Sequence, residues 1–278
     1  MRQAWANREV LSGALAAALG LGLVVAMGLL GWPGQPFDCG VGGCYCELPR
    51  PGLVRQLGNT WSNLGAVAAG LFLGAHAARL REARERASRP HPGLDTLGLL
   101  FPPVLVFQGV GSMLFHGGLT LWGSALDAMS MFATTGLLVA TNLHRLGWLG
   151  ARGIVFLWGG LMTAGVIAGF VAPPAVPNLV FVLFLTILVT EVVLTRRGQT
   201  PSALLFRAGL ALHLVGVTVW FFSAADGLPL CDPQSPWQGH GLWHLTAAGA
   251  VSLFALHAFR NLSLVAAGQG RTLLGPRW

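Results

Sequence analysis

The sequence predicts an all-α fold, a polytopic bundle of transmembrane helices with about eight spans. Of the 278 residues, 54% are hydrophobic and only 10% are charged, and the mean hydropathy is +0.63. An average soluble domain has about 25% charged residues, so this composition argues against a soluble globular protein. Eight apolar stretches are also long enough for a helix to cross a bilayer, which takes roughly 20 residues.

The predicted spans follow one another with short loops between them. The first, Val10–Leu30, follows a basic start, as the apolar part of a secretory signal peptide would. Its apolar run is longer than such a signal needs and no clear cleavage site of small residues follows it, so we interpret it as a retained helix. The other seven predicted spans are Trp61–Leu80, Leu97–His116, Trp122–Leu143, Ile154–Val171, Asn178–Leu194, Ala203–Ser223 and His240–Phe259.

The basic residues predict how the bundle lies in the membrane. All 17 are Arg, and they give a net charge of +7 and a pI of about 10.9. With the N-terminus placed inside, 15 of the 17 fall in inside segments, and only Arg50 and Arg55 fall outside. Because cytoplasmic loops are enriched in Lys and Arg, we expect both termini in the cytoplasm. The compact chain, rich in Arg, Gly and Ala, favours a bacterial inner membrane. The basic charge then needs no nucleic-acid partner.

Four cysteines fall in the first and last outside loops, where disulfides persist. If Cys231 pairs, it must pair with one of the three early residues Cys39, Cys44 and Cys46. The connectivity is not readable from the spacing. The alternative is a thiolate metal site, because Cys44 and Cys46 form a close pair.

A few ionisable side chains lie inside the predicted spans, where they are costly and therefore candidates for function. His240 and His244 are four residues apart and share one helix face, as Ser112 and His116 do. Asp127 follows His116 across a short glycine-containing turn and lies at a similar depth on the next helix. By the predicted topology, all five residues lie at the outer end of the bundle.

Three histidine ligands with one open position are typical of a catalytic zinc site. His116, His240 and His244 would be the ligands. Asp127 would orient a ligand or take a proton from metal-bound water, and Ser112 would donate to a developing oxyanion. The alternative is a set of interhelical hydrogen bonds that stabilise the bundle.

Glu191 is another ionisable residue within a predicted span. It lies close in sequence to Arg196 and Arg197, at the inner end of its span. The simplest interpretation is a structural ion pair with one of these two residues.

The polar residues follow in the order Ser112-x-x-x-His116, Asp127 and His240-x-x-x-His244. This order resembles the alkaline ceramidase family and the wider superfamily of seven-helix membrane hydrolases. That superfamily also includes progestin and adiponectin receptors and lipid-anchor remodelling enzymes. Cys46-Glu47 and the segment Asn59-Thr60-Trp61-Ser62-Asn63 favour the ceramidase branch. The resemblance covers roughly residues 44–260. It implies a seven-helix membrane domain over 33–262, preceded by an additional helix within 1–32 and followed by a short cytoplasmic tail over 263–278.

The resemblance implies an amidase that cleaves ceramide or a ceramide-like lipid within the membrane into a long-chain base and a fatty acid. It implies a Zn²⁺ ion on the three histidines, with Asp127 serving the water and Ser112 assisting. It also implies a disulfide between Cys46 and Cys231. No protein partner follows from it.

The same resemblance implies a Ca²⁺ site in the outer loop, built from acidic and amide side chains. The match to that site is partial. Glu47 is present, but Cys44 and Gln56 occupy positions where the family has acids, and Asp38 does not align. The sequence therefore leaves Glu47 as a possible calcium ligand.

Three other functions are open to this set of residues. The first is a lipid hydrolase that acts on another acyl amide or an ester, since the core motif does not separate the substrates. The second is a receptor or sensor with a structural zinc ion. The third is a transporter with His116 and Asp127 as a proton relay, which the absence of matching halves with interrupted helices disfavours.

Overall fold

A computed structural model describes residues 8–39 and 44–268 of the chain. This part of the chain is all-α, and its only β pairing is one isolated bridge between Pro36 and Thr120. The helices are α2 (Arg8–Leu29), α3 (Leu57–Trp61), α4 (Leu64–Arg86), α5 (Pro92–Gly118), α6 (Leu121–Arg145), α7 (Ala151–Val171), the short 3₁₀ helix η1 (Pro173–Ala175), α8 (Val176–Arg196), α9 (Leu204–Ser223) and α10 (Gly239–Ala266).

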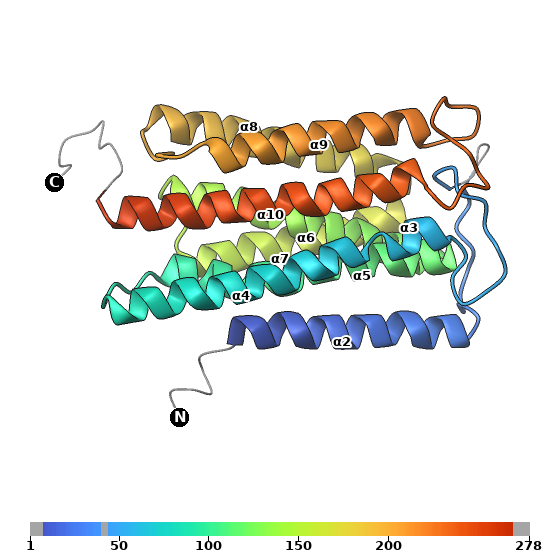
Figure 1. Ribbon diagram of the computed structural model, residues 1–278, viewed down its shortest axis with the longest axis horizontal. Helices are drawn as coiled ribbons and strands as arrows, with labels where there is room; N and C mark the ends of the chain where they lie inside the picture. Colours follow the sequence, from blue (N-terminus) through green and yellow to red (C-terminus); the bar gives the residue numbers. More distant parts are fainter. Residues whose placement is uncertain (1–7, 40–43, 269–278) are drawn as a thin grey trace.

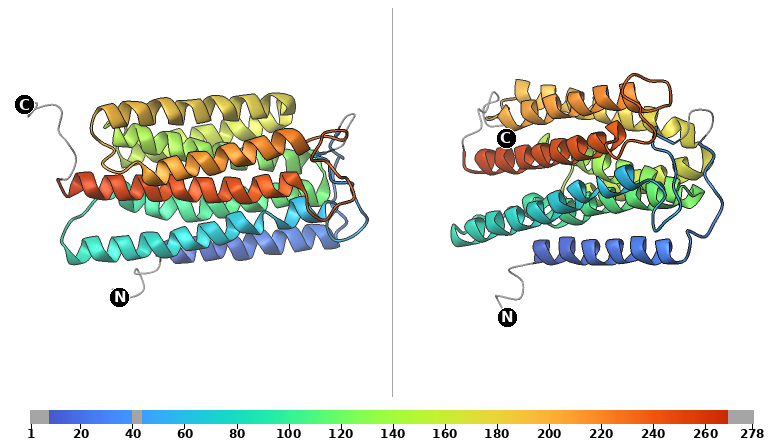
Figure 2. Two further views of the ribbon diagram at one scale, coloured as in Figure 1. Left: turned by 45° about the horizontal axis from the view of Figure 1, so that its top comes forward. Right: turned by 45° about the vertical axis from the view of Figure 1, so that its right-hand side comes forward.

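The long helices lie side by side and successive helices run in opposite directions (Figures 1 and 2). Alternate connections therefore meet at the same end of the bundle. The long connections, described over residues 30–39, 44–56 and 224–238, share one end. This is the end that the charge distribution predicts to face outward, and it is called the outer end below.

Seven of the eight predicted spans are confirmed as helices long and apolar enough to cross a membrane. They indicate an integral membrane protein. The remaining one, α4, packs against α5 and α10 in the bundle. Its second half carries four arginines, Arg79, Arg81, Arg84 and Arg86, which lower its hydropathy. That α4 also spans the bilayer therefore stays a prediction.

The second predicted span begins a few residues before α4, because a break separates α3 from α4 at Ser62 and Asn63. The backbone N–H of Asn63 bonds to the Thr60 carbonyl at 3.3 Å, not to that of Asn59. The Asn59 carbonyl instead accepts from the side chains of Ser62 at 3.2 Å and Asn63 at 2.8 Å. The polar side chains of the two residues thereby take the place of one main-chain hydrogen bond of a helix.

The predicted partner of Glu191 is wrong. Its carboxylate accepts a hydrogen bond from Arg145 at 2.6 Å and lies 2.9 Å from His257 Nε2, so it does not pair with Arg196 or Arg197. Arg145 ends α6 and His257 lies on α10. The true partners are distant in sequence, and together they tie three helices at the inner end of the bundle.

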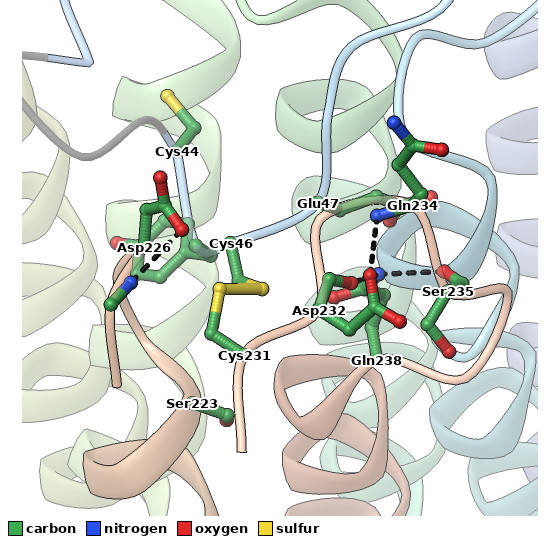
Figure 3. Close-up of a disulfide and its surroundings, with 12 residues drawn as sticks. Cys44, Cys46, Glu47, Ser223, Asp226, Cys231, Asp232, Gln234, Ser235 and Gln238 are labelled. Carbon is green, nitrogen blue, oxygen red and sulfur yellow. Dashed lines mark hydrogen bonds between the residues drawn. A yellow bond between two sulfur atoms is a disulfide. The ribbon is translucent and has the colours of Figure 1, made fainter. Parts of the chain in front are cut away.

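Two disulfides close the outer end. Cys46 is bonded to Cys231, which joins segments 185 residues apart in sequence, and Cys39 is bonded to Cys44. Figure 3 shows the first bridge between the segment that precedes α3 and the segment that precedes α10. The Cys46–Cys231 pairing agrees with the family resemblance. Because no described cysteine is free, the thiolate metal site is excluded.

These bridges predict the thiol chemistry of the protein. We expect no reactive thiol in denatured, unreduced protein and four after reduction. The Cys46→Ser/Cys231→Ser double variant should lose about 2–5 kcal/mol of stability, because its bridge closes a long loop. The matched Cys39→Ser/Cys44→Ser variant, whose loop spans a separation of only five residues, should lose less. Equal losses in melting temperature, or four thiols before reduction, would contradict this assignment.

Candidate metal centre

The three predicted histidine ligands converge at the outer end of the bundle. His116 lies in the last turn of α5, and His240 and His244 lie on the first turns of α10. All three side chains are buried, and one ring nitrogen from each lies within 4.8 Å of the other two. In the described part of the chain, this is the only group of three or more His, Cys, Asp or Glu residues placed in that way.

The separation of one pair of ring nitrogens fits a zinc ion. His116 Nε2 lies 3.2 Å from His240 Nε2. Two nitrogens bound tetrahedrally to zinc at roughly 2.0–2.1 Å lie about 3.4 Å apart. Three neutral imidazoles are a common ligand set for zinc, and they leave the fourth position open.

A buried glutamine sets the orientation of His116. The Oε1 atom of Gln56 lies 2.7 Å from His116 Nδ1. The Gln56 amide nitrogen donates both of its hydrogens, to the carbonyl of Cys44 at 2.6 Å and to that of Glu47 at 2.7 Å. Oε1 must therefore accept the Nδ1 proton, which leaves Nε2 of His116 free for a metal, as in many zinc sites.

The break between α3 and α4 supplies the partners of His244. Its Nδ1 lies 2.9 Å from Ser62 Oγ and 3.0 Å from Asn63 Nδ2. The Asn59 carbonyl is also within hydrogen-bonding reach of this ring. The oxygens of Ser62 and Asn59 can accept a proton from Nδ1, which would leave Nε2 of His244 for a metal. The break between α3 and α4 thus places Ser62 and Asn63 next to His244.

Tyr45 is a site residue that the sequence did not reveal. Its ring stacks on His240 with centroids 4.1 Å apart and an interplanar angle of 16°. Burial raises the pKa of Tyr45 to about 12, and the nearby Asp127 carboxylate adds to the shift, so the phenol stays protonated. It is the only Tyr of the chain and lies between two disulfide-bonded cysteines, but neither property predicts a contact with His240.

Ser112 and Asp127 complete the predicted set. Ser112 lies one turn before His116 on α5, and its Oγ is 3.4 Å from His244 Nε2. The Asp127 carboxylate on α6 is within hydrogen-bonding reach of the Ser112 hydroxyl. The structure therefore brings all five predicted residues to one end of the bundle, with Ser112 between the histidines and the carboxylate.

A surface cleft of about 380 Å³ lies at the opposite, inner end of the bundle. It is bounded by α4, α9 and α10 and lined by His76, Leu80, Leu205, Leu256, Arg260, Ser263 and Leu264. None of the five site residues contributes to it, so the cleft is no part of the metal centre.

One of three comparisons with known proteins found a match. The model of the family described as Ceramidase matches residues 53–271. The matched region contains all three histidines, Ser112 and Asp127, and it leaves out α2. Searches of curated proteins and of solved structures found no match.

Proposed function

Because the chain belongs to the ceramidase family, we propose that it is a zinc-dependent membrane hydrolase that cleaves the amide bond of ceramide or a ceramide-like lipid. The products are a long-chain base and a fatty acid. The observation that carries this proposal is the buried cluster of His116, His240 and His244, with Ser112 and Asp127 beside it.

Two of the three histidines would hold the metal with their other ring nitrogen already hydrogen-bonded, whereas the buried Nδ1 of His240 has no hydrogen-bond partner among the described residues. For His116 the fixing group is the Gln56 side chain, and for His244 it is the turn at Ser62. A bound zinc ion would supply a Lewis acid and would lower the pKa of a bound water toward 7.

Asp127 and Ser112 have separate tasks in this reaction. Asp127 takes one proton from the attacking water as its oxygen bonds to the amide carbon. The Ser112 hydroxyl donates to the carbonyl oxygen while negative charge develops there. When the C–N bond breaks, Asp127 returns the proton to the nitrogen, so the leaving group departs as an amine. The reaction then consumes one water and leaves Asp127 ionised as before.

The surroundings of the site suit a lipid substrate. The helices that carry the site belong to a bundle whose surface holds many large apolar side chains, among them Phe156, Phe170 and Phe181. A lipid with its chains among such side chains would bring its amide to the outer end. With the predicted topology, the chemistry would take place at the outer face of the membrane.

The experiment that tests this function is a substrate panel. Purified protein is incubated with ceramides, other acyl amides and acyl esters, and released fatty acid is measured. We expect release from ceramide-like amides that exceeds release from esters. A preference for esters would support the alternative lipid hydrolase, and no turnover of any lipid by zinc-loaded protein would favour the receptor or sensor.

A further inference from the structure

The outer loop differs from a calcium site in the use of its oxygen atoms. Both carboxylate oxygens of Glu47 accept backbone N–H groups at the start of α3, from Gly58 and Asn59 at 2.8 Å each. The sequence left Glu47 as a possible calcium ligand. In the structure its carboxylate instead caps the start of α3. Cys44 is in a disulfide, and in the described residues no cluster of three acids surrounds Glu47.

A neutral side chain occupies the centre of this loop. Gln56 is completely buried, and its amide nitrogen donates to the Cys44 and Glu47 carbonyls. These two carbonyls and the Glu47 carboxylate are the kinds of oxygen that calcium prefers. A cation among them would lie against the positive end of the Gln56 amide, which opposes its binding.

Gln56 also holds the metal centre at two points. Its Oε1 accepts the Nδ1 proton of His116, and its backbone N–H donates to the His116 carbonyl at 3.2 Å. One side chain, that of Gln56, thus holds the loop through two carbonyls and also sets the tautomer of His116. Replacement of this side chain should affect both the loop and the metal affinity.

We propose that Gln56 replaces a bound cation in the outer loop, so that the loop and the zinc centre assemble without calcium. Gln56 is then a positioning residue that acts through His116. The part of this proposal that concerns zinc rests on the proposed function, whereas the part that concerns the loop does not.

The Gln56→Glu variant tests the proposal directly. Its carboxylate would place an oxygen against the Cys44 and Glu47 carbonyls in place of the two donors. A bound cation or protonation of the carboxyl would relieve that repulsion, so the comparison with and without calcium is made at one fixed pH. Zinc affinity is measured by competition with a chromophoric chelator, and the melting temperature is measured on metal-free protein. Each is recorded without calcium and at about 1 mM calcium, the range of weak extracellular sites.

In the wild type, we expect calcium to change neither zinc affinity nor melting temperature. In Gln56→Glu, a carboxylate oxygen can still accept the Nδ1 proton of His116. The main expected effect without calcium is therefore a lower melting temperature of the metal-free protein, which calcium should largely restore. In Gln56→Met, which offers neither the two donors nor the acceptor for His116, the melting temperature should fall and zinc should bind about 10–100-fold more weakly, the usual cost of losing a partner of a ligand. Calcium should restore neither.

Gln238→Glu is the matched control. Gln238 also donates to two loop carbonyls, those of Asp232 at 3.1 Å and Ser235 at 2.7 Å, but its side chain bonds no histidine (Figure 3). This variant should melt earlier while its zinc affinity stays close to the wild-type value.

Two results would overturn the proposal: a wild type stabilised by calcium, or a Gln56→Glu variant that matches the wild type without calcium. A wild type that binds no zinc would instead contradict the proposed function. In that case the melting temperatures of the metal-free variants would still decide whether Gln56 replaces a cation.

Discussion

Replacing His244 with alanine should remove the metal from the protein and abolish turnover. Purified wild type should contain about one zinc per chain, since three histidines form one site. Loss of a ligand should weaken zinc binding by more than the 10–100-fold that loss of a ligand's partner costs. Turnover should fall by more than about 10³-fold, the upper cost of removing a single oxyanion donor. Zinc content is measured by elemental analysis and turnover by release of fatty acid.

His213→Ala is the matched control for this variant. His213 lies on α9, stacks on Phe184 with centroids 4.3 Å apart, and is not part of the three-histidine group. It should therefore keep its zinc and most of its turnover. A metal-free wild type that hydrolyses the lipid at full rate would exclude the zinc mechanism, and a His244→Ala variant with a full zinc content would exclude His244 as a ligand.

The fold was largely predictable because span length and charge are local properties of the sequence. The predicted span Ile154–Val171 became α7 over Ala151–Val171, and Ala203–Ser223 became α9 over Leu204–Ser223. A bilayer requires each span to bond its own backbone, so long apolar runs have few alternatives to a helix. The exception at Ser62 arises because side chains there compete with the backbone for the Asn59 carbonyl.

The cluster of three histidines was predictable from the sequence, but the side chains that contact these histidines were not. His240 and His244 share a face by spacing alone, and the predicted topology placed His116 at the same end. The contacts of Tyr45 and Gln56 with these rings depend on the path of a loop through non-helical positions. No periodicity describes such a path. The pairing of Glu191 with Arg145 was also not predictable from spacing, because it joins residues of different helices.

Replacing Asp127 with asparagine should leave the metal in place and remove most of the turnover. The side chain is not one of the three clustered ligands, and an amide can still accept the hydrogen bond that Ser112 offers. It cannot take a proton from water, so the rate should fall by about 10²–10⁴-fold, the usual contribution of a general base. Zinc content should equal that of the wild type, which separates this variant from His244→Ala.

Asp95→Asn provides the matched control for this loss. Asp95 lies in the first turn of α5, at the inner end, where it pairs with Arg84. The same chemical change at that position removes a carboxylate far from the histidines, so turnover should stay close to the wild-type rate. If Asp127→Asn also kept that rate, the proton would have to go to another group. Tyr45 could not be that group, because burial keeps its phenol protonated with a pKa of about 12.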